Sequence, residues 1–244
     1  MQERAEAQPE PPNRSRAYHS PRRDTGVPGD GESLSLLLRA GRTVFARTSY
    51  HGVTVDEICR EAGISRGTFY FYFRDKRHLF VHLITEEGSE FTALARRQYP
   101  GKDEYSRIVA ANAAYLYWME GAAPLLAQML SLALSDEEIR RQYEAGRHRV
   151  EERIRRRLAL IDDIDPGDHA DPALLASALV SMVESFAIRY FTVESPIDVR
   201  HVRFTEALRA ISETWYRAAY GRTPPHDFVY EEYLPEGMRD AARG

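Results

Sequence analysis

The chain has 244 residues, of which 43% are hydrophobic and 29% charged, so it has enough apolar surface to bury one or two cores without metals or disulfides. Its single cysteine, Cys59, excludes an intrachain disulfide and cannot build a zinc site by itself. The apolar stretches 108–119 and 121–135 are shorter than the roughly 18 to 20 residues needed to cross a bilayer. No positively charged start leads into an apolar signal segment. These two observations predict a cytoplasmic, globular protein with no membrane partner.

The net charge of −4 is unevenly distributed along the chain. Residues 1–32 carry a net charge of −1, residues 33–82 carry +4 and residues 83–244 carry −7. A basic segment joined to an acidic remainder is typical of a polyanion-binding unit attached to a body with another role. The split therefore favours nucleic acid as a partner of the basic segment.

Residues 1–32 are rich in Pro, Gly, Ser and charged residues and have no apolar periodicity, which predicts a disordered arm. Within it, residues 11–23 hold four arginines and no acidic residue. Two interpretations carry equal weight. The arm lies along a DNA groove, as some N-terminal arms do, or it is a solvated tail.

The basic segment is predicted to hold three helices. Apolar residues recur at helical spacing over 34–49, which predicts the first helix. Thr54 and Glu57 form a capping box at the start of the second helix, and Gly63 ends it, as a left-handed C-cap requires. Ser65 caps the next helix after a short turn. Two short helices joined by a Gly-containing turn are a helix-turn-helix motif.

The rest of the chain keeps helical periodicity and shows no strand pattern. Asp75 is expected to cap a helix that runs to about Ser89. Five more helices are predicted at about 103–120, 122–134, 136–161, 172–193 and 198–220. The predicted fold is all-α and is divided into an arm (1–32), a helix-turn-helix domain (33–85), a helical body (86–220) and an irregular tail (221–244).

The run from Thr54 to Phe80, TVDEICREAGISRGTFYFYFRDKRHLF, resembles the DNA-binding signature of the TetR family of transcriptional regulators. The shared parts are T-V-x-x-I, A-G-I-S, G-T-F-Y, Y-F and K-x-x-L, in that order. Three positions depart from the pattern. Leu34 stands where a basic residue is usual and removes a phosphate contact, Gly41 replaces an alanine at a helix cost of about 1 kcal/mol, and Ser49 replaces a glycine.

The resemblance implies which side chains meet DNA. They are Thr54, Ser65, Arg66, Gly67, Thr68, Tyr70, Tyr72 and Lys76. Thr54, Tyr72 and Lys76 are implied phosphate contacts, whereas the others form the surface that reads bases and backbone. Arginine at position 66 suits bidentate recognition of guanine. Helical alternation places Phe69 and Phe73 in the core rather than against single-stranded bases.

The resemblance also implies that the body (86–220) binds a small effector. Two predicted helices face each other across an apolar slot, with Tyr115, Trp118 and Met119 on one and Met182, Phe186 and Tyr190 on the other. The second stripe has charges only at its edges, Glu184 and Arg189, so a strongly charged effector would lack a buried counterion. We therefore expect a hydrophobic or amphiphilic effector, oriented by tyrosine hydroxyls or by Asn112.

A homodimer contact is expected on the last two long helices. Phe204, Leu208, Ile211 and Trp215 form one stripe at helical spacing. Residues 173–183, which include Leu179, are apolar on nearly all sides, more than one core face needs. This surplus predicts a two-fold four-helix interface, which suits palindromic half-sites.

The arginine run at 153 and 155–157 leaves two interpretations open. It could bind phosphate, or it could form a salt-bridged exposed face with Glu151 and Glu152, which is the default for such a helix. His78 and His82 lie one turn apart, but no third ligand is evident. No metal and no cofactor are therefore expected.

The sequence as a whole is interpreted as a ligand-responsive, DNA-binding transcriptional regulator, a repressor that the effector releases from a palindromic operator. The alternative is a ligand-independent activator or architectural DNA-binding protein. An enzyme has little support, because the sequence lacks G-x-S-x-G, H-E-x-x-H, a P-loop and dinucleotide-binding glycines.

Overall fold

The structure is a computed structural model, which describes residues 30–99, 101–161, 171–192 and 203–234. Over these ranges the chain forms eight α-helices and a short 3-10 helix, with no β-strand, so the predicted all-α fold is confirmed. Almost all of the predicted arm, the expected start of the last long helix at 198–202, and residues 235–244 lie outside the described residues.

Three N-terminal helices form a compact head: α1 (Asp30–Arg47), α2 (Val55–Ala62) and α3 (Arg66–Tyr72). The Thr54 half of the expected capping box is present, since the Thr54 hydroxyl accepts a hydrogen bond from the Glu57 amide at 3.2 Å, whereas the Glu57 carboxylate pairs with Arg47 at 3.6 Å. Gly63 adopts the expected left-handed conformation with φ 68°. Phe69 is fully buried and Phe73 is 3% exposed. Their burial fixes α3 against the other two helices, as the helical alternation predicted.

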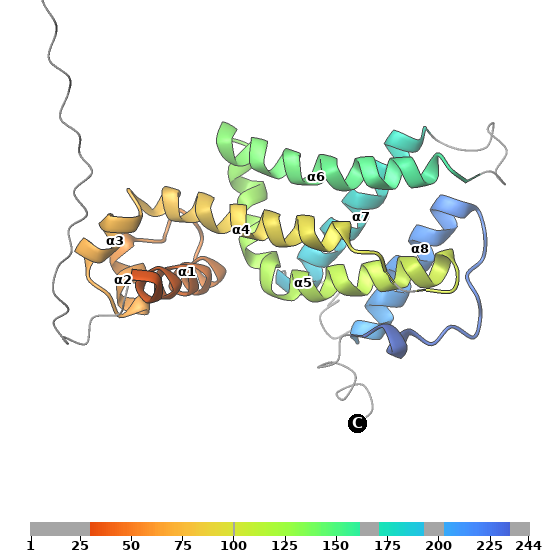
Figure 1. Ribbon diagram of the computed structural model, residues 1–244, viewed down its shortest axis with the longest axis horizontal. Coiled ribbons are helices and arrows are strands. Elements are labelled where there is room, and N and C mark those ends of the chain that lie inside the picture. Colours follow the sequence, from red (N-terminus) through yellow and green to blue (C-terminus); the bar gives the residue numbers. More distant parts are fainter. Residues whose placement is uncertain (1–29, 100, 162–170, 193–202, 235–244) are drawn as a thin grey trace, which may run out of the picture.

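Helix α4 (Lys76–Arg96) is a single continuous helix that leads from the head into the rest of the molecule (Figure 1). It therefore crosses the expected domain boundary at residue 85. Gly41 of α1 faces this helix, and a Cβ added there would lie 3.0 Å from Leu79 Cδ2 and 3.1 Å from Leu83 Cδ1. The glycine thus permits close packing of α1 on α4, which offsets its low helix propensity.

Helix α5 (Glu104–Ala133) is one helix where two were expected, and Pro124 lies inside it. A proline removes one backbone hydrogen bond and is expected to interrupt a helix. Around it, however, Ala122, Ala123 and Leu125 are buried. Packing on both sides of the proline therefore outweighs the local signal for a break.

The body consists of α5 with α6 (Glu137–Leu158), α7 (Pro172–Thr192) and α8 (Phe204–Tyr220). Helix α5 contacts the other three as well as α4, and α4 and α6 run along the same side of the body (Figure 1). The stretch after Gly221, expected to be irregular, ends in the 3-10 helix η2 (Tyr230–Tyr233). Tyr230 is buried and its hydroxyl hydrogen-bonds to that of Tyr105, so this part of the tail packs against α5.

Helix α7 corrects the expectation that every apolar stretch is too short to cross a membrane. It has 21 residues and a window of mean hydropathy 1.4, of which 28% is buried. By length and composition it could span a bilayer, but core helices of globular proteins pass the same test. Its contacts with α5, α6 and α8 place it as a helix of the body.

Candidate functional site

The first turn of α3 presents its polar side chains to solvent. Ser65, Arg66, Gly67 and Tyr70 are exposed, and Thr68 is half-buried. The Ser65 hydroxyl accepts a hydrogen bond from the Thr68 amide at 3.1 Å and lies 3.0 Å from the Thr68 hydroxyl. The structure therefore brings these five expected DNA-contacting residues together on one short exposed surface, the recognition surface.

Arg66 is held in place on this surface by two neighbours. Its Nη1 lies 3.0 Å from Asp56 Oδ1, its Nη2 donates to the Tyr70 hydroxyl at 3.4 Å, and its guanidinium lies 5.8 Å from the centre of the Tyr70 ring. The hydrogen bond to Tyr70 and the charge of Asp56 raise the pKa of Arg66. A guanine that binds Arg66 has to compete with Asp56 for its donors.

Lys76 differs from the expectation of a free phosphate contact. Its ammonium donates to the carbonyl oxygens of Tyr50 at 2.9 Å, Val53 at 2.8 Å and His51 at 3.2 Å, and it lies 4.9 Å from the centre of the Tyr50 ring. An ammonium has three donors, and all three are used. Lys76 therefore fastens the loop between α1 and α2. Of the other two implied phosphate contacts, Thr54 is exposed and Tyr72 is half-buried.

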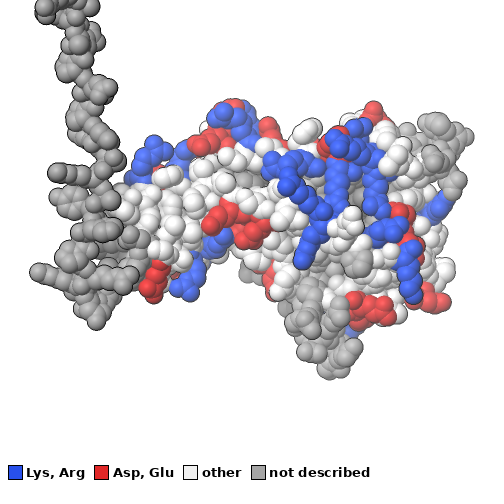
Figure 2. Space-filling view, viewed as in Figure 1, with Lys and Arg blue, Asp and Glu red and all other residues white. Residues whose placement is uncertain are grey.

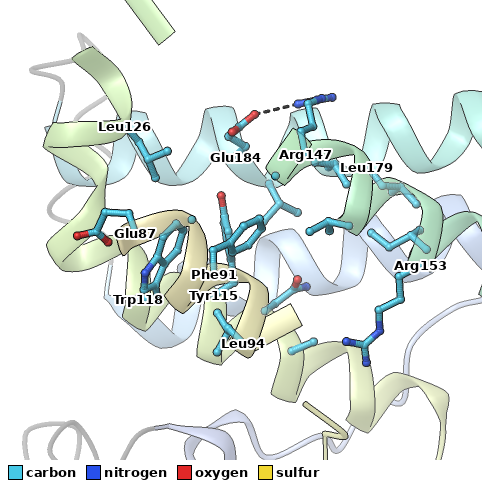
Figure 3. Close-up of a pocket in the computed structure, with 18 of the residues that line it drawn as sticks. Glu87, Phe91, Leu94, Tyr115, Trp118, Leu126, Arg147, Arg153, Leu179 and Glu184 are labelled. Atoms are coloured by element: carbon cyan, nitrogen blue, oxygen red, sulfur yellow. Dashed lines mark hydrogen bonds and ion pairs between the residues drawn. The ribbon is translucent and has the colours of Figure 1, made fainter. Parts of the chain in front are cut away.

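A cavity of about 670 Å³ lies between α4, α5, α6 and α7. Asn112, Tyr115 and Trp118 line it, as expected. Phe91 of α4 stacks on Trp118 with a centroid distance of 4.9 Å, and Figure 3 shows these rings grouped with Tyr115 at one end. The buried Trp118 indole nitrogen has no hydrogen-bond partner among the described residues. This end of the cavity thus combines apolar surface with an unused donor.

The other four slot residues lie elsewhere. Met119 is fully buried in the core, and Met182, Phe186 and Tyr190 are not among the residues that line the cavity. Helix α7 instead contributes Leu179, Val180, Val183 and Glu184. Helix α7 therefore presents a different face to the cavity from the expected one. Several of its faces are apolar, and the packing of the neighbouring helices decides which of them lines the cavity.

Charged side chains also line the cavity, contrary to expectation. Arg147 of α6 lies 2.9 Å from Glu184 of α7, and the Tyr143 hydroxyl donates to the same carboxylate at 2.8 Å. Burial raises the pKa of Glu184, and the bonds from Tyr143 and Arg147 oppose that shift. Figure 3 shows the Arg147 and Glu184 pair on one wall and Arg153 further along the cavity. Arg147 and Glu184 neutralise each other, whereas Arg153 has no carboxylate partner among the described residues and offers a counterion to an anionic ligand.

The residues expected at the dimer interface are largely buried inside the protomer. Leu208 is fully buried, Leu179 and Ile211 are 3% exposed, and Trp215 is 8% exposed, whereas Phe204 is half-buried. Leu179 and Trp215 line the cavity. A stripe at helical spacing predicts a buried face but does not identify the element that covers it. In this structure, α5 covers much of the apolar face of α8. The Asn112 amide also donates to Ser212 of α8 at 3.1 Å.

Sequence reasoning missed the walls that α4 and α6 contribute. Glu87 and Phe91 come from α4, and Arg147 and Arg153 come from α6. A signal was present in α6, since Tyr143, Val150 and Ile154 recur at helical spacing. The many charged residues of α6 favoured the interpretation of an exposed helix, so this apolar stripe was not assigned to a cavity wall.

The molecule is thus a helix-turn-helix protein with a helical body that encloses a cavity. Residues 37–83 match the family described as "Bacterial regulatory proteins, tetR family". Two HTH-type transcriptional regulators of Bacillus subtilis (strain 168), YdgC and YfiR, both described as uncharacterized, are 38% and 30% identical to this chain. The matches cover 26% and 46% of this chain and 32% and 56% of those relatives, respectively.

The fold matches solved structures over a longer stretch. A TetR-like transcriptional regulator from Rhodococcus sp. RHA1 aligns with a TM-score of 0.60 and 22% identity, over 78% of this chain and 97% of that one. This likeness shows a shared fold. The helix-turn-helix segment therefore matches the TetR family of regulators in sequence, and the longer stretch shares the fold of a TetR-like regulator.

Proposed function

We propose that the protein is a homodimeric, cytoplasmic transcriptional repressor that leaves a palindromic DNA operator when a small amphiphilic molecule fills the cavity. One observation carries the proposal. Helix α4 begins at Lys76 beside the recognition surface, and its second half, with Glu87 and Phe91, lines the cavity. A ligand that moves this wall therefore acts on the helix that supports the head.

Contacts between the head and the rest of the molecule support such coupling. Glu87 lines the cavity, is 8% exposed and forms an ion pair with Arg42 of α1. The Gln128 amide of α5 donates to the carbonyl oxygens of Phe45 and, at 3.2 Å, Thr48. A ligand releases DNA only if it binds the DNA-incompetent arrangement more tightly. Loss or gain of these contacts provides the two arrangements.

The homodimer is proposed to form through the outer face of α7. Leu174, Ala178, Ser181 and Ser185 are all exposed and recur at helical spacing, so they form one stripe of apolar and small residues. Such a stripe permits close approach of a second helix. A two-fold axis at this stripe would position the recognition surface of each protomer on one of the two half-sites of a palindromic operator.

DNA binding is tested with the full-length protein and the intergenic DNA beside its own gene. We expect a footprint with two-fold symmetry, which Arg66→Ala weakens by about 1 to 3 kcal/mol. Reporter transcription should rise when the gene is deleted. A protein without any footprint, or a reporter that falls on deletion, would contradict the repressor proposal.

Cavity binding is tested with the neutral, apolar fluorophore N-phenyl-1-naphthylamine. Gly146 lines the cavity, and a Cβ added there meets no atom within 4 Å. Gly146→Leu should fill the space, lower probe binding and leave DNA binding intact, whereas Gly146→Ala adds one methyl group and serves as the control. Equal probe binding by both variants would show that the cavity is not the binding site.

A further inference from the structure

A second hollow of about 1240 Å³ lies along α6 beside the end of α4. We call it the arginine groove. It is lined by six arginines, Arg96, Arg149, Arg153, Arg156, Arg157 and Arg222, against two acidic residues, Glu104 and Glu152. Figure 2 shows arginine and lysine gathered over this part of the molecule. The groove is positive although residues 83–244 carry a net charge of −7.

The arginine groove opens into the cavity. Phe91, Gln98, Gly146, Val150, Arg153 and Arg157 line both hollows. The shared wall therefore runs from the aromatic end of the cavity, at Phe91, to guanidinium groups at Arg153 and Arg157. A single ligand that spans both spaces meets apolar surface at one end and positive charge at the other.

Three arginines of the groove have no carboxylate partner among the described residues. Arg153 donates to the carbonyl oxygen of Arg97 at 2.8 Å, and no ion pair involves Arg96 or Arg149 over those ranges. By contrast, Arg156 pairs with Glu152 at 2.7 Å. Elsewhere on α6, arginines of the described chain are paired, as Arg140 and Arg147 show. Of these three arginines, Arg153 lines both spaces, and Arg96 and Arg149 line the groove alone.

The cavity wall holds a further unused donor on Arg107, which does not line the groove. Arg107 lines the cavity and pairs through Nη2 with Glu104 at 2.5 Å. Its Nε is buried and has no hydrogen-bond partner in the described part of the chain. A buried donor without a partner is costly, and an acceptor oxygen of a ligand that reaches it from the cavity would satisfy it.

We infer that the cavity binds an amphiphile whose extended apolar chain lies among Phe91, Trp118 and Met129 and whose phosphate head lies in the arginine groove. The inference rests on the proposed function and names the class of its effector. A phosphate ester carries more charge and more acceptor oxygens than a carboxylate, and guanidinium groups match its geometry. The positive charge of three unpaired arginines is larger than the single negative charge of a carboxylate. A nucleic acid would use the groove but leave the apolar cavity empty.

The test measures binding to the full-length protein by calorimetry, with each amphiphile below its micelle concentration. Dodecyl phosphate is compared with dodecanol, dodecanoate and inorganic phosphate. We expect dodecyl phosphate to bind at least about tenfold more tightly than each of the others, since charge-assisted hydrogen bonds add to apolar burial. Lysophosphatidic acid and dodecanoyl coenzyme A then distinguish a lipid phosphate from a phosphorylated carrier.

The double variant R149Q/R153Q removes two unpaired charges of the groove. We expect it to weaken dodecyl phosphate binding about tenfold and to leave dodecanol binding unchanged, which also shows that the variant is folded. R140Q/R141Q, on the same helix outside the groove, is the matched control and should bind like the wild type.

Equal binding of dodecanol and dodecyl phosphate, or an unaffected double variant, would overturn the phosphate head but leave ligand-controlled DNA release in place. Binding of a short DNA duplex that depends on Arg149 and Arg153, without dodecyl phosphate binding, would instead assign the groove to nucleic acid. If none of these amphiphiles binds the protein or alters its DNA footprint, the ligand response of the proposed function itself is contradicted.

Discussion

Arg77 and Asp136 join the start of α4 to the start of α6 through two parallel hydrogen bonds, each 2.8 Å long, from Nε and Nη2 of the arginine to the two carboxylate oxygens. The same carboxylate caps α6, since Asp136 Oδ1 accepts from the amides of Glu138 and Ile139. The bonds from Arg77, together with those amides, lower the pKa of Asp136 to about 2. One side chain thus fixes two helices that both line the cavity.

This pair predicts a dependence of stability on pH. Because the pKa of Asp136 is about 2 in the folded state and 3.8 for a free carboxyl, its contribution is complete above about pH 4 and is lost as the pH falls toward 2. Arg77→Gln should lower the free energy of unfolding by about 1 kcal/mol at pH 7. The deficit should shrink at pH 3, in urea titrations followed by circular dichroism.

Arg74→Gln is the matched control, because Arg74 is exposed and lies three residues away. It should behave like the wild type at both pH values. A deficit for Arg77→Gln that is equal at pH 7 and pH 3 would show that the charge of Asp136 is not its source.

The contacts of Lys76 predict a loss of stability when its charge is removed. Lys76→Met leaves the carbonyl oxygens of Tyr50, His51 and Val53 without their donor, which should lower the free energy of unfolding by about 2 kcal/mol. Lys102→Met, at an exposed position, should have little effect. If Lys76→Met keeps full stability and lowers the salt slope of DNA binding by about 1, Lys76 is a phosphate contact after all.

The helix-turn-helix segment could be predicted because its signals are local. The Thr54 cap, the left-handed Gly63 and the Ser65 cap depend on residues three or fewer positions apart. The burial of Phe69 follows from helical spacing, whereas Phe73 is buried just past the end of α3, in an extended conformation. The first turn of α3 was therefore predicted from the sequence in nearly its observed form.

The body could be predicted only in outline, because its details depend on contacts between distant residues. The continuity of α5 through Pro124 depends on packing around it, and the face that α7 presents to the cavity depends on its neighbours. The same limit applies to Leu208, whose burial by α5 no local spacing could distinguish from burial by a second protomer.

Two aromatic residues on α3 should differ sharply in their effect on stability. Phe69 is fully buried, so Phe69→Ala should lower the free energy of unfolding by about 3 to 5 kcal/mol. Phe71 is 75% exposed, and Phe71→Ala should change it by less than about 0.5 kcal/mol. Chemical denaturation of the two variants measures both. Similar losses would mean that α3 is rotated from the arrangement described.

The ion pair between Arg66 and Asp56 predicts that DNA binding improves when the acid is neutralised. Asp56→Asn removes a competitor for the guanidinium and a negative charge beside the DNA, so affinity should rise by a few-fold. Fluorescence anisotropy on the footprinted duplex measures it, with Asp103→Asn, a helix cap in the body, as the control. Unchanged affinity with Asp56→Asn would show that Arg66 is not limited by this pair.

Burial of the α8 stripe predicts that its variants act on the protomer rather than on the dimer. Leu208→Ala should create a cavity and lower the free energy of unfolding by about 2 to 4 kcal/mol at a fixed protomer concentration, while the folded fraction stays dimeric in light scattering. Ala178→Arg, on the exposed face of α7, should do the reverse and give a folded monomer with unchanged helix content. If Leu208→Ala dissociates the dimer and spares the protomer, the stripe belongs to the interface. A dimeric Ala178→Arg variant would instead place the two-fold axis away from the outer face of α7.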